Sequence, residues 1–243
     1  YELLIAKYNE KWQFSNKIHA SISWDGRNYV DKIPHGYVLS ASFTYAGGIL
    51  GGLSNYNKIA LSASLYRGIW QFGSKEEGNL KNLILGVSSE IDLMLPQYWL
   101  FGDSTGWKNP KMGATKYEML YIDGMNIGRG FSVVYDQAFL WNNQVDLTFP
   151  LAEDVLSLEA FVSATGVQSD LEKINSLSSI NWYLAAGAGI KMEIPGFPLG
   201  LYLVKNATIK NNEGWKWQNG SLFSGSKEGS GLSLVLAITT SIY

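Results

Sequence analysis

The side chains that most often carry out enzyme chemistry are scarce in this sequence. It holds two histidines, His19 and His35, and no cysteines. A Ser-His-Asp triad would need one of these histidines beside a serine and an acid, yet His35 lies in an expected turn with no nucleophile elbow around it. No phosphate-binding loop, dinucleotide fingerprint or His-Glu-x-x-His motif occurs. We therefore expect no enzyme, no cofactor and no bound metal.

Charged residues are few, and one of them stands in an unusual setting. They make up 16% of the chain, against about 25% in soluble domains. With a net charge of −2 and no basic tract, nucleic acid is not an expected partner. Arg129 lies within Gly128-Arg129-Gly130-Phe131 at the end of a long loop. A guanidinium group is a planar fork that suits carboxylates or carbonyls, but Arg129 alone could equally be a solvated loop residue.

The elements that would position such residues are strands. Residues 56–71, 154–163 and 232–242 alternate between apolar and small or polar side chains, and alternate side chains of a strand point to opposite faces. The same pattern recurs along most of the chain, and residues 132–149 could hold two strands around Asn142-Asn143. The expected strands are 1–14, 16–25, 36–46, 56–72, 80–95, 115–122, 132–149, 154–166, 180–194, 198–211 and 230–242.

Composition and loop lengths favour strands that cross a membrane. The chain has 9 Trp and 14 Tyr, and most of the tryptophans stand near expected strand ends, as in an interfacial girdle. Short links such as 150–154 alternate with long polar loops such as 97–114 and 212–229. No apolar run reaches the roughly 18–20 residues of a membrane helix. We expect an all-β, antiparallel, up-and-down transmembrane barrel with about eleven or twelve strands in this chain. The alternative is a soluble β-sandwich.

Several motifs occur in an order that is more specific than any one of them alone. They are Tyr45-Ala46-Gly47-Gly48-Ile49-Leu50-Gly51-Gly52, Arg129-Gly130-Phe131, Phe149-Pro150-Leu151, and Phe161-Val162-Ser163-Ala164-Thr165-Gly166. This order resembles the back part of the barrel in the BamA superfamily of outer-membrane assembly and translocation proteins, over about residues 24–243.

The resemblance implies a fold and a function. The family has a sixteen-stranded barrel preceded by periplasmic POTRA modules, so residues 1–243 would be a single domain forming its C-terminal portion, without those modules. The implied function is the folding and insertion of β-barrel proteins in the bacterial outer membrane. Its partners would be the lipid bilayer, unfolded client barrels and accessory lipoproteins. The alternatives are a two-partner secretion pore of the same superfamily and a passive porin or structural outer-membrane protein.

The resemblance also implies site residues. Gly128, Arg129, Gly130 and Phe131 would form the tip of a loop that folds back into the lumen, with Arg129 facing the inner wall. Acidic partners known in the family would fall near Thr148 and Ser163, which are not acidic. Strand periodicity makes Asp146 and Glu159 the candidate substitutes. The last strand would form a seam that opens to clients, and its expected residues are Leu232, Leu234, Leu236, Ile238 and Tyr243. Tyr243 departs from the even-numbered apolar stripe, which a bulge would explain.

Overall fold

A computed structural model describes residues 14–30, 33–74, 81–96, 113–115, 117–152, 155–194, 197–210 and 213–238. These residues form an all-β structure with three short 3-10 turns. No helix among them is long and apolar enough to cross a membrane. The strands are β1 (Lys17–Asp25), β2 (Asn28–Val30), β3 (Ile33–Ala46), β4 (Tyr56–Phe72), β5 (Lys81–Pro96), β6 (Leu120–Ile122), β7 (Val134–Gln137), β8 (Phe139–Ala152), β9 (Leu156–Gln168), β10 (Asn181–Ile194), β11 (Phe197–Lys210), β12 (Gly214–Trp217) and β13 (Ser233–Ile238).

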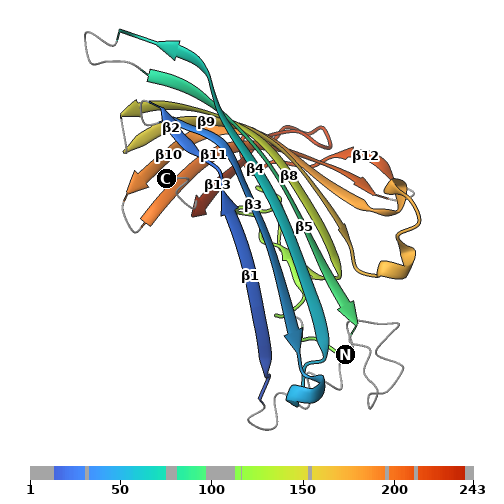
Figure 1. Ribbon diagram of the computed structural model, residues 1–243. Coiled ribbons are helices and arrows are strands. Elements are labelled where there is room, and N and C mark those ends of the chain that lie inside the picture. The colour runs from blue at the N-terminus through green and yellow to red at the C-terminus, as the bar shows by residue number, and fades with distance from the viewer. Residues whose placement is uncertain are drawn as a thin grey trace.

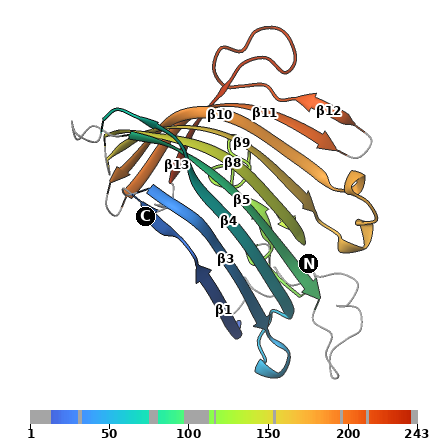
Figure 2. The ribbon, with the colours of Figure 1, turned by 45° about the horizontal axis from the view of Figure 1, so that its top comes forward.

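One large antiparallel sheet contains all of these strands except β6 and β7. Its order is β1-β3-β4-β5-β8-β9-β10-β11-β12, with β13 also paired to β11 and β2 paired to β3. The sheet curves strongly and encloses a concave side (Figures 1 and 2). Within the described residues it has two edges, formed by β1 on one side and by β12 and β13 on the other. The up-and-down antiparallel order matches the expected one.

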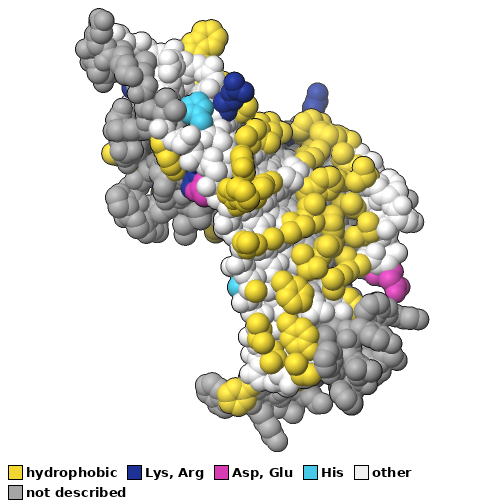
Figure 3. Space-filling view, in the orientation of Figure 1, with side chains coloured by type: hydrophobic (Ala, Val, Ile, Leu, Met, Phe, Trp, Pro, Cys, Tyr) yellow, Lys and Arg dark blue, Asp and Glu magenta, His cyan; other side chains and the backbone are white. Residues whose placement is uncertain are grey.

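The two faces of the sheet differ in chemistry, as β9 illustrates. Ser157, Glu159 and Phe161 are buried on the concave side. Leu158 and Val162, at the alternate positions, are exposed on the convex side. Cross-strand partners share a face, and the register carries the same division to the neighbouring strands. Figure 3 shows hydrophobic side chains gathered over the convex face. The remaining large convex side chains that are exposed include Ile18, Ile22, Leu39, Phe43, Leu61, Leu65, Val87, Val145, Leu147, Ile190, Leu201, Leu203, Leu234 and Leu236.

The segment between β5 and β8 fills part of the concave side. Its β6–β7 hairpin is separate from the main sheet and lies inside the curve (Figure 2). Met119, Leu120 and Ile122 are buried there in one cluster with Met94 of β5 and Leu140 of β8. Burying these side chains anchors the loop against the wall, since removal of apolar surface from water is favourable.

The strand beside β11 is interrupted. β12 pairs with the Ala207–Lys210 end of β11, and β13 pairs with the Leu199–Val204 part. Between them residues 219–231, here called the arm, leave the sheet. A bridge between Leu222 and Leu232 and a hydrogen bond from the Gly220 N–H to the Ser230 carbonyl give the base of the arm a hairpin form. The sequence predicted one uninterrupted loop at 212–229, and β12 within it was missed.

The expected turn at Asn142-Asn143 is wrong, because both residues lie inside β8. The Oδ1 atom of Asn142 accepts a hydrogen bond from Thr165 of β9, and that of Asn143 accepts one from Ser89 of β5. Cross-strand hydroxyl groups thus replace the local backbone contacts that make asparagine a turn former. The strand break within 132–149 falls at Ala138 instead, between β7 and β8.

Other boundaries shift by a few residues. The expected strand 115–122 shrinks to β6, and β8 continues through Pro150 to Ala152. The short hairpin strand β2 was not expected. Of the expected strand 1–14, only Phe14 lies within the described residues.

Candidate functional site

The Arg129 loop is shaped before it reaches the sheet. The carboxylate of Asp123 accepts hydrogen bonds from the backbone N–H groups of Met125, Asn126 and Ile127 at 2.8, 2.8 and 2.9 Å. This Asx-type arrangement satisfies three neighbouring donors at once. The Gly130 N–H then donates to the Gly124 carbonyl at 2.9 Å. The loop is therefore a closed ring of local bonds that presents Arg129 at its tip.

Glycine is required on both sides of Arg129. Gly128 and Gly130 have φ of 66° and 84°, a left-handed region that other residues rarely adopt. A Cβ atom on Gly130 would lie 2.7 Å from Oδ1 of Asn206, and one on Gly128 would lie 2.6 Å from Cγ2 of Ile122. At these two positions the surrounding atoms therefore leave no room for a Cβ atom.

Arg129 crosses from the loop to the wall of the sheet. Its Nη1 atom donates to Oε1 of Glu159 on β9 at 2.8 Å, and the two side chains are only 7% and 5% exposed. Asn206 of β11 donates its Nδ2 to the Arg129 carbonyl at 2.8 Å. The loop tip is therefore joined to two strands, once through its side chain and once through its backbone.

Two aromatic rings enclose the guanidinium group. Its central carbon lies 4.5 Å from the ring centre of Phe161 and 4.6 Å from that of Tyr202. The two rings stand nearly perpendicular, with centroids 5.6 Å apart. Cation–π attraction and an ion pair thus act on the same cation, and both are strengthened by exclusion of water. From the sequence, Phe161 was noted only as part of a strand motif, and Tyr202 was not noted.

Phe131 and Asp146 complete the sequence-predicted set around the loop. The Phe131 ring packs edge-on against Tyr183 of β10 with centroids 5.0 Å apart. Of the two candidate acids, Glu159 is the one paired with Arg129. Asp146 also lies on the concave side, and its Oδ1 accepts a hydrogen bond from Gln144 at 3.3 Å. Thr148 is the cross-strand neighbour of Glu159. The acid therefore stands on the strand next to Thr148, one of the two positions that the resemblance indicated.

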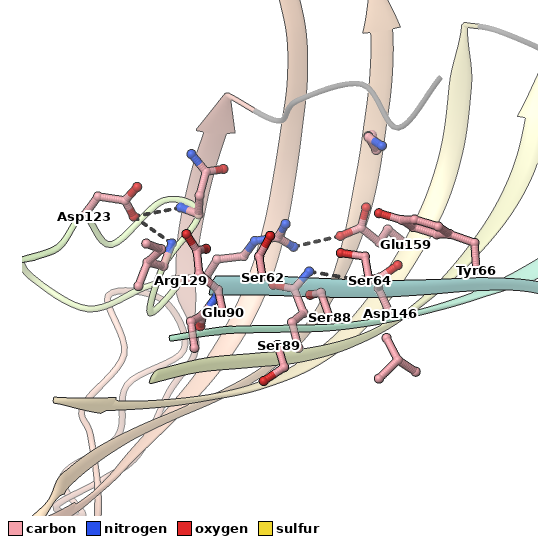
Figure 4. Close-up of a pocket in the computed structure, with 16 residues that line it drawn as sticks. Ser62, Ser64, Tyr66, Ser88, Ser89, Glu90, Asp123, Arg129, Asp146 and Glu159 are labelled. Carbon is pink, nitrogen blue, oxygen red and sulfur yellow. Dashed lines mark hydrogen bonds and ion pairs between the residues drawn. The ribbon is translucent and has the colours of Figure 1, made fainter. Parts of the chain in front are cut away.

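A polar hollow of about 470 Å³ lies between the loop and the strands (Figure 4). Serines of β4 and β5 line it on one side, and the Arg129–Glu159 pair lies on the other. Glu90 faces this hollow, whereas Asp92, on the same strand face, is paired with Lys58 at 3.3 Å. The charged residues of its lining are Glu90, Asp123, Arg129, Asp146, Glu159 and Lys191. Acids exceed bases, so the hollow favours cations over anions.

A second carboxylate ties the same loop to the far end of the sheet. Glu118 lies 2.6 Å from Nζ of Lys17 on β1 and accepts hydrogen bonds from Ser54 and the Thr115 N–H at 2.7 and 2.9 Å. Burial alone would raise the pKa of Glu118, but hydrogen bonds from Lys17, Thr115 and Ser54 outweigh it and lower that pKa below its ordinary value. No motif marked Glu118 in the sequence.

The expected seam residues do not share one setting. Leu234 and Leu236 of β13 are 51% and 54% exposed on the convex face. Leu232 stands just before the strand in its bridge with Leu222. Ile238 ends β13 opposite Leu199, and Tyr243 lies outside the described residues. Among the described strands, β13 has β11 as its one neighbour.

The comparisons with known proteins do not decide the family. The chain matches no family model, no curated protein and no solved structure. The resemblance to the BamA superfamily stays a prediction. Among the described residues, no three His, Cys, Asp or Glu side chains are grouped so that they could hold a metal ion.

Proposed function

We propose that this chain belongs to an outer-membrane β-barrel protein that folds and inserts other barrel proteins. The observation that carries the proposal is the buried ion pair between Arg129 and Glu159, which joins a loop tip to the concave wall. The pair holds the loop inside the curve of the sheet, which is the arrangement that the resemblance to the BamA superfamily implies.

The faces of the sheet support the membrane part of the proposal. The convex face exposes leucine, isoleucine, valine and phenylalanine over most of the main-sheet strands, whereas soluble proteins rarely expose large continuous apolar patches. The concave face carries the charged groups and a polar hollow. In a membrane barrel the outward face is apolar and the interior is polar.

The edge strands support the assembly part. β13 offers unpaired backbone groups along one side within the described part of the chain. An extended client segment can add to such an edge by main-chain hydrogen bonds. The seam that the proposal requires would include β13.

A secretion or conduction pore is the second candidate, and the hollow favours it. The acidic lining would pass cations or a cationic segment more readily than anions. The two functions share the fold and the loop, and they differ in whether the protein acts on unfolded barrels.

The test uses the full-length protein reconstituted in liposomes. The rate at which an unfolded client barrel becomes protease-resistant is measured for the wild type, Arg129→Ala and Lys173→Ala. Lys173 is a matched control, because it also forms an ion pair but its side chain is 69% exposed. We expect acceleration by the wild type and by Lys173→Ala, and its loss in Arg129→Ala. If the wild type conducts ions but leaves the client rate unchanged, the pore replaces assembly as the function.

A further inference from the structure

The arm is an insertion into a strand that is otherwise in register. On β11, Val204 pairs with Ser233 and Ala207 pairs with Trp217. Three steps along β11 thus correspond to sixteen along its partner, so the partner carries thirteen extra residues, the length of segment 219–231. The Gln218 N–H still donates to the Asn206 carbonyl at 2.9 Å, so pairing continues up to the base of the arm. The sheet itself does not need these residues.

Lys205 holds the base of the arm. Its Nζ atom donates to the carbonyls of Gln218, Gly229 and Gly231 at 3.2, 2.5 and 2.7 Å. Three bonds use all three donors of the ammonium group. Lys205 alternates with Leu201 and Leu203 along β11, which places it on the convex face. The base of the arm is therefore held from the convex side. Figure 2 shows the arm standing off the sheet beyond β11 and β12.

Lys205 interrupts the apolar stripe of β11, which resumes with the exposed Ile209 on the same face. Leu201 and Leu203 precede it on the convex face, and the next strand contributes Trp215 and Trp217 beyond it, with rings 5.1 Å apart. Tryptophans and lysines gather where a hydrocarbon layer meets water. The base of the arm thus carries the residue types of such a boundary, and water there can satisfy the polar groups of its irregular backbone.

The arm exposes one large hydrophobic residue, Phe223, which directly follows Leu222 of the bridge. The Phe223 side chain is 81% exposed, and its backbone has a φ of 54°. Phenylalanine rarely adopts this left-handed conformation, which costs free energy unless something else compensates. The residues around it, from Asn219 to Gly231, are mostly glycine and serine. Phe223 is therefore the only large apolar side chain of the arm besides Leu222, which lies in the bridge at the base.

We propose that the arm is a lipid anchor that inserts Phe223 into the interfacial layer of a bilayer beside the β13 edge, with Lys205 fixing its direction. The inference rests on the proposed membrane location and extends it to residues outside the sheet. The occupant is lipid because the arm continues the exposed convex face, and because Trp215 and Trp217 lie at its base.

The experiment uses the absence of cysteine from the whole chain. Single-cysteine variants of the full-length protein are labelled with bimane and reconstituted in phosphatidylcholine vesicles with bromine at shallow or deep acyl positions. Phe223→Cys reports on the arm. Tyr117→Cys is the matched control, since Tyr117 is also 81% exposed but belongs to the loop inside the curve. Leu236→Cys reports on the convex face itself.

We expect shallow bromine to quench the label at 223 several-fold more than the label at 117. If the label at 236 is quenched but that at 223 behaves like that at 117, the lipid anchor is excluded while the membrane location stands. That result would indicate that Phe223 contacts a protein partner instead of lipid. If the label at 236 is not quenched either, the membrane proposal itself fails. With Lys205→Met added, quenching at 223 should fall sharply, and an unchanged pattern would overturn the role of Lys205.

Discussion

Arg129 and Glu159 form an ion pair that links a loop to a strand thirty residues further along the chain, with both side chains almost fully buried. A buried pair of this kind contributes little net stability relative to apolar side chains of the same size, but the loss of one partner leaves a charge without compensation. This asymmetry gives the first prediction.

Arg129→Ala or Glu159→Gln should each lower the free energy of unfolding by about 3–5 kcal/mol, because each leaves one polar partner buried alone. The double variant Arg129→Met with Glu159→Leu should recover most of that loss. Urea unfolding monitored by tryptophan fluorescence measures all three. Equal losses in the single and double variants would show that the pair carries no such coupling.

Gly130→Ala should release the loop from the wall. The new Cβ would meet the Asn206 side chain at 2.7 Å in a backbone with a φ of 84°. Gly51→Ala is the matched control, because Gly51 has a φ of 66° and nothing within 4 Å of its Cβ position. The control should lose only about 1–2 kcal/mol from backbone strain. Limited proteolysis near residues 123–131 should accelerate in Gly130→Ala and stay slow in Gly51→Ala, and similar cleavage in both would refute the close approach.

Tyr202 should act through its ring and not through its hydroxyl group. Among the described residues its buried hydroxyl has no hydrogen-bond partner. Tyr202→Phe should therefore keep wild-type stability, whereas Tyr202→Leu should lose about 0.5–2 kcal/mol of cation–π attraction with Arg129 in addition to any packing defect. Thermal unfolding of both variants, repeated in an Arg129→Met background, separates the two effects. A large loss in Tyr202→Phe would contradict this assignment.

Glu118 should make the loop sensitive to acid. Its folded-state pKa lies below the ordinary value of 4.5, so the ionised carboxylate stabilises the folded state. That contribution is complete above pH 4.5 and is lost as the pH falls through the lowered pKa. Hydrogen exchange at the amides of Met119 to Ile122 should speed up below pH 4.5, after correction for intrinsic rates. In Glu118→Gln this extra dependence should disappear, and its persistence would assign the effect to another group.

Much of the sheet could be predicted from alternation alone, because its two faces have opposite chemistry. β4 and β9 begin and end within two residues of their expected bounds. The misplaced turn at Asn142-Asn143 has a clear cause. Asparagine favours turns through local backbone bonds, and only the three-dimensional register reveals that Thr165 and Ser89 take up those side chains instead.

The candidate site was predictable only in part. Arg129 and its flanking glycines were picked out by the resemblance and not by residue type alone, and strand parity made Asp146 and Glu159 the candidate acidic partners. The choice between those two depends on the direction in which the loop points the Arg129 side chain, which no sequence pattern encodes. Tyr202 and Phe161 look like ordinary strand residues, so their place around the guanidinium group emerges only when β9 and β11 are set side by side. Lys205 was hidden for a similar reason, since its three partners are backbone carbonyls.

The thirteen-residue offset between β12 and β13 has a practical consequence for handling this protein. The two short ladders meet β11 independently on either side of the arm, so their register does not depend on what joins them. Loop tips of this kind accept insertions and deletions best. The arm is therefore the natural place to graft an epitope tag or a display peptide, and labelling of such a graft on intact cells would test whether the arm is reachable from outside the cell.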